Sequence, residues 1–301
     1  MIRIYLKYSW YDSQKCKTLA LSRFCTLRSH RIFIRDIHSL LFHNLPPTFI
    51  TICPGTRDWF LISSPFPGLT ILGIYLYVVL NLGPKLMKNR EPFSLQYILL
   101  AFNAVQIVAC FYTVYQGITL AWGNKYSLVC EPVGDFNNPL VVDIAWKFCY
   151  GYFVIKLVDL LDTVFFVLRK KQKQVSFLHV YHHAGMICLS WGIIKWQPGG
   201  HGTFLILVNS CVHIIMYFYY LLTAYDEEYK KSSWWKKYVT QVQIIQFCMI
   251  IIHFSAVFFV EDCAYPKLPS IIMIPQNLFM VILFSDFYWR TYLVKKPKKS
   301  D

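Results

Sequence analysis

Long apolar runs occupy most of this chain and constrain its fold more than any other feature. Seven runs have the length that a helix needs to cross a bilayer, about 17–25 residues. They cover residues 66–82, 93–115, 142–168, 177–194, 203–223, 237–259 and 270–292. Only 15% of the 301 residues are charged, against about 25% in soluble domains. We therefore expect an all-α membrane protein with seven transmembrane helices.

The Lys and Arg residues predict how these helices are oriented. Loops 83–92, 169–176 and 224–236 and the tail from Arg290 are basic, whereas the intervening loops hold only Lys125, Lys195 and Lys267. Because basic loops stay in the cytosol, we expect a cytosolic C-terminus. The net charge of +14 follows from such loops, although they also attract a polyanionic substrate or anionic lipid. We expect no nucleic-acid partner.

The two ends of the chain differ from the apolar middle. Residues 1–57 are basic, and we interpret them as a disordered extension or an artefact of gene prediction. Residues 58–294 hold the seven runs, and residues 295–301 form a basic tail. The chain ends in Lys298-Lys299-Ser300-Asp301, which looks like the dilysine retrieval signal of endoplasmic reticulum membrane proteins, an address read by a receptor.

Three histidines stand close together in the segment His179-Val180-Tyr181-His182-His183. On a helix, residues three and four apart share a face, so His179 meets both other histidines. An imidazole at membrane depth is costly and needs a reason beyond packing. The cluster therefore indicates either a metal site or a site with a nucleophile and an acid/base group.

Other polar residues recur at helical spacing in neighbouring runs. At about 1.5 Å of rise per residue, all lie roughly 5–21 Å from the predicted cytosolic helix ends. This convergence predicts one polar chamber open to the cytosol, with interhelical hydrogen bonding as the alternative role for Asn209, Gln243 and Gln246. The residues are Lys156, Asp159 and Asp162 in the third run, Asn209 and His213 in the fifth, and Thr240, Gln243 and Gln246 in the sixth. Tyr217 shares the stripe of Asn209 and His213, with packing at the membrane interface as its alternative role.

The histidine count separates the possible metal sites. His201 and His253 fall near the opposite side of the membrane, and His30, His38 and His43 fall in the extension. The four remaining imidazoles are too few for a two-iron shell without several carboxylates, but they suffice for one zinc. Without a metal, the same imidazoles suit nucleophilic and acid/base chemistry near neutral pH.

Ten cysteines are present, and five of them lie in the apolar runs as small hydrophobic residues. Cys130 and Cys263 fall in two loops on the non-cytosolic side, where the compartment is oxidising. We predict that they form a disulfide, with two free thiols as the alternative.

Four blocks together resemble the ELO family of fatty acid elongases, in the style of its insect members. Residues 156–163 (KLVDLLDT) resemble the family's KxxELxDT, with Asp159 where Glu is usual. Residues 174–183 (QVSFLHVYHH), 209–220 (NSCVHIIMYFYY) and 240–246 (TQVQIIQ) match QxxFLHxYHH, NxxxHxxMYxYY and TxxQxxQ. The resemblance extends from about Asp58 to the C-terminus.

This resemblance implies a seven-helix elongase domain in which six helices form an inverted barrel around a tunnel open to the cytosol. It implies condensation of a long-chain acyl-CoA with malonyl-CoA to 3-oxoacyl-CoA, CO2 and CoA, the first step of very-long-chain fatty acid elongation. Both thioesters are substrates, and no cofactor or metal is implied. The expected partners are acyl-CoA, malonyl-CoA, membrane lipid and the reductases and dehydratase of the elongation cycle, in the endoplasmic reticulum membrane.

The resemblance also implies roles for single residues. His182 is the expected nucleophile, His213 would stabilise or protonate the enolate, and His179 and His183 would orient His182. A route without a covalent intermediate is the alternative. The expected substrate-binding residues are Lys156, Asp159, Asp162, Gln174, Asn209, Tyr217, Gln243 and Gln246.

Two other classes of protein compete with an elongase. A histidine-box di-iron membrane desaturase or hydroxylase has similar hydropathy and an HxxHH segment. A seven-helix receptor or transporter gives no reason for HxxHH beside QxxQ on the cytosolic side, and the chain has no N-x-Ser/Thr sequon.

Overall fold

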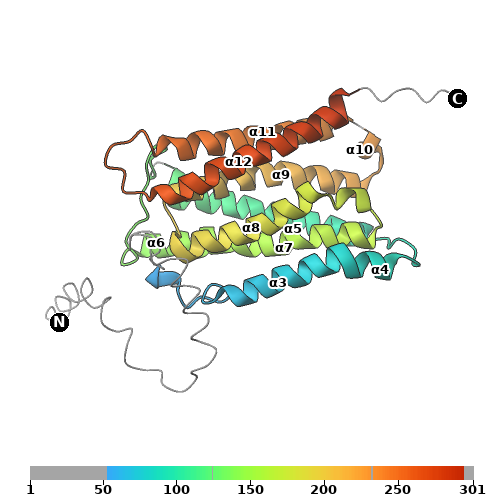
Figure 1. The fold of residues 1–301 in the computed structure, drawn as a ribbon, viewed down its shortest axis with the longest axis horizontal. Helices are drawn as coiled ribbons and strands as arrows, with labels where there is room; N and C mark the ends of the chain where they lie inside the picture. The colour runs from blue at the N-terminus through green and yellow to red at the C-terminus, as the bar shows by residue number, and fades with distance from the viewer. Residues whose placement is uncertain (1–52, 124, 232, 295–301) are drawn as a thin grey trace, which may run out of the picture. The chain divides into compact units, whose positions relative to one another are not determined.

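The computed structural model describes residues 53–123, 125–231 and 233–294. Of the predicted extension 1–57, residues 53–57 are described, and the tail 295–301 lies outside the described residues. Seven long helical segments follow one another along this part of the chain and run side by side as a bundle (Figure 1).

Several of the long segments are α-helices extended by a π-helical turn. A 3-10 turn, η3 (Pro54–Thr56), precedes the first segment, which comprises α3 (Pro65–Tyr77), η4 (Val78–Leu82) and α4 (Gly83–Met87). The second comprises α5 (Gln96–Gln116) and η5 (Gly117–Trp122). The third comprises α6 (Pro139–Asp143), η6 (Ile144–Tyr150) and α7 (Gly151–Leu168).

The remaining segments are simpler. After the turn η7 (Gln172–Gln174) come α8 (Phe177–Trp196), the turn η8 (His201–Thr203) and α9 (Phe204–Tyr225). A short α10 (Glu228–Lys231) leads to α11 (Ser233–Ala256), and the last segment comprises α12 (Lys267–Tyr288) and η9 (Trp289–Leu293). The seven predicted runs thus correspond to seven helical segments, with ends that differ by up to seven residues.

Five of the described segments are long and apolar enough to cross a membrane on their own: Pro65–Met87, Gln96–Trp122, His201–Tyr225, Trp234–Ala256 and Lys267–Leu293. The predicted runs 142–168 and 177–194 are helical but lie outside this set. The first carries Lys156, Asp159 and Asp162, and the second carries three histidines. The residues that lower the hydropathy of these two helices are therefore those predicted to form the site.

Local sequence explains where several helices begin. Ser64 accepts a hydrogen bond from the Phe66 amide at 3.3 Å, and Pro65 follows as the first helical residue, the position where proline needs no amide hydrogen. Asn138 and Pro139 begin α6 in the same way. Ser176 accepts from the His179 amide at 3.3 Å, so the histidine cluster lies in the first two turns of a capped helix.

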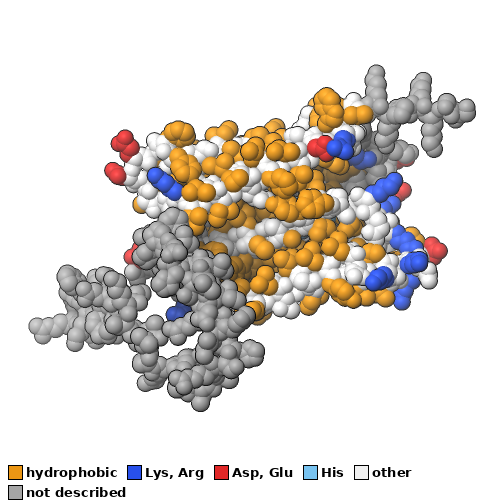
Figure 2. All heavy atoms as spheres, in the orientation of Figure 1, with side chains coloured by type: hydrophobic (Ala, Val, Ile, Leu, Met, Phe, Trp, Pro, Cys, Tyr) orange, Lys and Arg blue, Asp and Glu red, His pale blue; other side chains and the backbone are white. Residues whose placement is uncertain are grey.

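The helices pack in pairs around a core that α7 and α8 share. α5 lies against α9, α11 against α12, and α7 against α8. The core includes Phe148, Tyr152 and Phe153 of the third segment, each at most 1% exposed. Large apolar side chains also lie exposed on the outside of the bundle (Figure 2), as expected for a surface that faces lipid.

The two ends of the bundle have different chemistry. We name the end that carries the disulfide the disulfide end, and the opposite end, where α8 begins, the histidine end. Lys and Arg side chains gather at the histidine end, on the right of Figure 2. The basic loops 88–95 and 169–176 both lie there.

Loop contacts tie the disulfide end together. Cys130 and Cys263, the pair predicted from the sequence, form a disulfide with a Cα–Cα distance of 5.9 Å. The Tyr126 hydroxyl accepts from the Gly200 amide at 3.3 Å, and burial raises the pKa of Tyr126 to about 12. Gly200 has φ +64°, and a Cβ there would lie 2.8 Å from the Glu131 carbonyl oxygen; only glycine fits this approach.

His201 and His253 form a further contact at this end that the sequence did not predict. Their rings stack with centroids 3.7 Å apart. Each Nε2 hydrogen-bonds the other residue's backbone carbonyl, at 2.9 Å and 3.1 Å. Both histidines thus lie away from the cluster on α8, as predicted, and they join α11 to the start of α9.

Replacing Cys130 by Ser tests the contribution of the disulfide. Removing a bridge across 133 residues should cost roughly 2–5 kcal/mol of stability and lower the thermal unfolding temperature in detergent. The double variant Cys130→Ser/Cys263→Ser should lose no more than either single variant, and Cys188→Ser, a free exposed cysteine, should lose nothing. Non-reducing peptide mapping that finds both thiols free would contradict the bond.

Candidate functional site

A buried ion pair on α7 lies at the centre of the polar residues. Lys156 Nζ lies 2.8 Å from Asp159 Oδ2, and the two side chains are 3% and 1% exposed. Their spacing of three residues puts both on one face of the helix. A single unpaired charge would be strongly destabilising inside an apolar bundle, and the pairing of the two charges lowers that cost.

His213 of α9 lies against this pair. Lys156 Nζ is 3.3 Å from its Nδ1 and 3.4 Å from its Nε2, and its Nδ1 is 3.7 Å from Asp159 Oδ2. A lysine ammonium can only donate, so it donates to whichever ring nitrogen lacks a hydrogen. The predicted meeting of the third and fifth runs is therefore present, with His213 directly beside the ion pair.

Tyr217, one turn further along α9, connects two carboxyl groups. Its hydroxyl lies 3.0 Å from Asp159 Oδ1 and 2.7 Å from Asp162 Oδ2, and its side chain is fully buried. Gln106 of α5 also donates its amide hydrogens to Asp159 and lies 3.4 Å from the Tyr217 oxygen. Three helices thus meet at one carboxylate.

Amide side chains extend the network toward α11. The Tyr152 hydroxyl donates to Asn209 Oδ1 at 2.7 Å, and Asn209 Nδ2 donates to Gln246 Oε1 at 3.4 Å. Asn209 and Gln246 are 3% and 4% exposed. These contacts are the interhelical hydrogen bonds considered above, and they also place two amides beside the charged residues.

The histidine cluster lies on the adjoining face of α8. His179 and His183 have ring centroids 4.2 Å apart, and His182 and His183 have centroids 5.7 Å apart. The three rings are half-buried. His179 contacts Thr163, which lies one turn beyond Asp159 on α7, so the cluster adjoins the polar face of α7.

A hydroxyl chain fixes the first histidine of the cluster. His179 Nε2 and Thr163 Oγ1 lie 2.9 Å apart, and the Thr163 hydroxyl lies 2.8 Å from that of Tyr75 on α3. Thr163 is fully buried. The two hydroxyls orient the ring of His179 and make no hydrogen bond to His182 or His183.

Three predicted residues lie apart from this network. Gln174 is exposed in η7, at the mouth of the histidine end. Gln243 is half-buried and lies 3.8 Å from the sulfur of Met216. Thr240 is buried and donates to the Lys236 carbonyl on its own helix. Sequence reasoning missed Gln106, Tyr152 and Tyr75, polar residues in apolar runs that belong to none of the four blocks.

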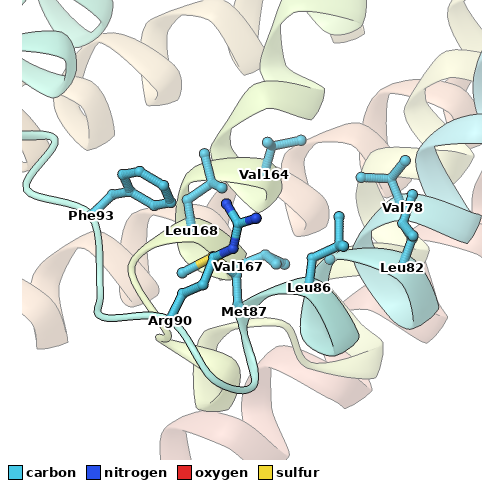
Figure 3. A pocket seen from close by; sticks show the side chains of 10 residues that line it. Val78, Leu82, Leu86, Met87, Arg90, Phe93, Val164, Val167 and Leu168 are labelled. Carbon is cyan, nitrogen blue, oxygen red and sulfur yellow. The ribbon is translucent and has the colours of Figure 1, made fainter.

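A groove on the side of the bundle is separate from the polar network (Figure 3). It has a cavity volume of about 210 Å³ and runs between the α3–α4 segment and α7, with Arg90 over its apolar lining. None of the predicted site residues lines it. The lining residues are Val78, Leu82, Gly83, Leu86, Met87, Arg90, Phe93, Val164, Val167 and Leu168.

The arrangement of the His, Cys, Asp and Glu side chains decides whether they could bind a metal ion. Among the described residues, no group of three or more His, Cys, Asp or Glu has an arrangement that would hold a metal ion. His213 instead has the ammonium of Lys156 as its neighbour, and a cation there competes with a metal for the ring nitrogens.

Comparison with known proteins identifies the family. The family model described as "ELO: GNS1/SUR4 family" matches residues 60–300. The chain belongs to this family. The ELO protein is 42% identical to "Very long chain fatty acid elongase 7" of Rattus norvegicus over 241 residues, which cover 79% of this chain and 85% of that protein.

Two further relatives agree. "Very long chain fatty acid elongase 7" of Drosophila melanogaster is 42% identical over 245 residues, with 81% of this chain and 74% of that protein covered. "Very long chain fatty acid elongase 1" of Homo sapiens is 38% identical over 244 residues, with 79% and 86% covered. The family that the four sequence blocks indicate is therefore confirmed.

The variant Lys156→Met tests the ion pair. It leaves Asp159 buried without its cation, which should cost about 3–5 kcal/mol and lower the unfolding temperature. Asp159→Asn should also destabilise, but the double variant Lys156→Met/Asp159→Asn should lose clearly less than the sum because no unpaired charge remains. Equal and additive losses would show that the two side chains do not interact.

Proposed function

We propose that this ELO-family protein is a very long chain fatty acid elongase, an acyltransferase of the 3-oxoacyl-CoA synthase type. It condenses a long-chain acyl-CoA with malonyl-CoA, releasing CO2 and CoA, in the endoplasmic reticulum membrane. The observation that carries the proposal is the buried Lys156–Asp159 pair with His213 against it, beside the α8 histidines, of which His179 contacts Thr163 of the same helix α7. The three relatives named above are all called very long chain fatty acid elongases, which supports the same reaction.

The first half-reaction transfers the acyl group to the protein. A neutral imidazole nitrogen of His182 attacks the thioester carbon, the carbon–sulfur bond breaks, and CoA leaves as a thiolate that takes up a proton. The product is an acyl-imidazole. His183 and His179 restrict the ring by contact, and the Thr163 hydroxyl orients His179.

The second half-reaction forms the carbon–carbon bond. Malonyl-CoA loses CO2, and the resulting enolate carbon attacks the acyl carbon; the bond from that carbon to the His182 nitrogen breaks, and the nitrogen takes up a proton from water, which restores the neutral imidazole. Lys156 and His213 would supply positive charge and a hydrogen-bond donor to the enolate oxygen, and their mutual contact at 3.3 Å supports a shared role. Asn209 and Gln246 offer further amide groups for the thioester oxygens.

The proposed topology follows from the polarity of the two ends. Seven helices cross the membrane, six of them forming an inverted barrel around a tunnel, with the histidine end and the C-terminus in the cytosol. α7 and α8 cross only because their polar faces meet inside the bundle. Basic residues of the loop 169–176 at the histidine end, including Lys170 and Lys171, would attract the phosphates of CoA.

No cofactor enters this scheme, since both thioesters are consumed as substrates. The reductases and dehydratase of the elongation cycle are the expected consumers of the 3-oxoacyl product. No observation favours a di-iron desaturase over an elongase. Purified protein analysed for iron and zinc should contain less than one tenth of an atom per chain; stoichiometric iron would revive the desaturase.

One assay tests the reaction itself. Microsomes that express the full chain are incubated with radiolabelled malonyl-CoA and a panel of saturated and unsaturated acyl-CoAs. Labelled products two carbons longer than the acceptor are expected, and their pattern gives the chain-length preference. Microsomes with empty vector are the control, and equal labelling in both would reject the elongase.

The variant His182→Ala tests the covalent route. It should lower condensation at least a thousandfold, and it should abolish labelling of the protein by radiolabelled acyl-CoA in the absence of malonyl-CoA. Cys188→Ser, an exposed position further along α8, should retain both activities. A His182→Ala protein that condenses at the normal rate would eliminate the acyl-imidazole and leave the route without a covalent intermediate.

A further inference from the structure

We propose that Gln106 of α5 is a positioning residue of the condensing site, whose side-chain amide fixes Asp159 and, through it, Lys156 and His213. The inference rests on the elongase function proposed above and adds a residue that no sequence block contains. Gln106 is 1% exposed and lies in the second apolar segment, eleven residues into α5.

The contacts of Gln106 are specific for the site. Its Nε2 donates to Asp159 Oδ1 and lies 3.4 Å from the Tyr217 hydroxyl. A carboxamide buried without partners costs several kcal/mol in an apolar environment. The carboxylate of Asp159 and the oxygen of Tyr217 offset this cost for Gln106. It gives α5 its direct hydrogen bond to the ion pair.

The two oxygens of Asp159 have different partners. Oδ2 receives the Lys156 ammonium at 2.8 Å and lies 3.7 Å from His213. Oδ1 receives Gln106 and lies 3.0 Å from the Tyr217 oxygen. Because Gln106 holds Oδ1, the carboxylate cannot rotate, and Oδ2 stays directed at Lys156. The ammonium then stays within 3.3 Å of the His213 ring.

Hydrogen counting shows why a second donor is needed. The Tyr217 hydroxyl has one proton but faces two carboxyl groups, and its distance to Asp162, 2.7 Å, is the shorter. When that proton points to Asp162, Asp159 Oδ1 loses a donor unless another group supplies one. Gln106 supplies it, because its amide is always a donor whatever the state of the two acids.

The lengths of the two side chains are complementary. Asp159 stands where the family motif has Glu, and it is one methylene shorter; Gln is one methylene longer than Asn. The variant Asp159→Glu/Gln106→Asn therefore keeps the total length of the pair, its charge and its hydrogen-bonding groups while moving one methylene from α5 to α7. A packed interior does not accommodate the gain or loss of one methylene without a shift. Each single variant therefore changes the distance between the amide and the carboxylate, whereas the double variant keeps it.

The reciprocal exchange is the test. Purified full-length wild-type, Gln106→Asn, Asp159→Glu and double-variant proteins are compared for the kcat and KM of condensation and for unfolding temperature. Each single variant should lower kcat at least tenfold and change the KM for acyl-CoA less than threefold. The double variant should return to within threefold of the wild-type kcat. Gln116→Asn, the same change about 15 Å further along α5, is the matched control.

Several outcomes overturn the proposal. Losses in kcat that multiply in the double variant, or a wild-type kcat in Gln106→Asn, show that Gln106 does not position Asp159. Coupling that appears in the unfolding temperature but not in kcat shows a role in folding alone. If a single variant does not fold, Gln106→Leu, which keeps the volume but not the amide, takes its place; a wild-type kcat in Gln106→Leu rejects the role. A wild-type protein without condensation activity rejects the elongase function, and this role with it.

Discussion

The buried pairing of Lys156 with Asp159 governs the organisation of this molecule. A cation and an anion within an apolar bundle need each other and further hydrogen-bonding partners, because charge in such surroundings is stable only when its polar atoms are satisfied. The partners come from α5 as Gln106 and from α9 as His213 and Tyr217. The ion pair therefore determines which faces of three helices turn inward. The side chains that hydrogen-bond it are the residues that make up the site.

The two ends of the bundle complement each other. At the disulfide end, the Cys130–Cys263 bond and the stacked pair His201 and His253 join loops that are distant in sequence, which restrains the helices there. At the histidine end the basic loops are short and the histidine rings are half-buried. A bundle that is tied at one end and polar at the other suits a reaction between charged carriers that enter from one side and an apolar chain that extends inward.

The sequence predicted the parts of the site that repeat with a helical period. Asn209, His213 and Tyr217 lie on one stripe, and the spacing of Lys156 and Asp159 requires a shared face, so their contacts followed from geometry. Gln106 and Tyr152 also have polar neighbours at helical spacing, Asn103 on α5 and Lys156 on α7, but the sequence does not show which residues of another helix they contact. Gln174 belongs to a conspicuous block but lies in an exposed turn before the start of α8, and its predicted role stays a prediction. The largest shift of a helix end has a local reason, since the π-helical turn η5 (Gly117–Trp122) prolongs the second segment past the predicted end at residue 115.

The same argument explains why only five of the described helical segments are long and apolar enough to cross a membrane on their own. α7 and α8 each carry polar residues that would be costly in lipid, yet in the bundle two of those residues face one another, since Thr163 of α7 meets His179 of α8. Each helix supplies the polar surroundings that the other lacks. Neither can therefore be read as a membrane span in isolation, and the feature that conceals them from a composition criterion is the feature that assembles the site. A chain that made both helices apolar enough to cross alone would lose the imidazoles and the ion pair on which the proposed chemistry depends.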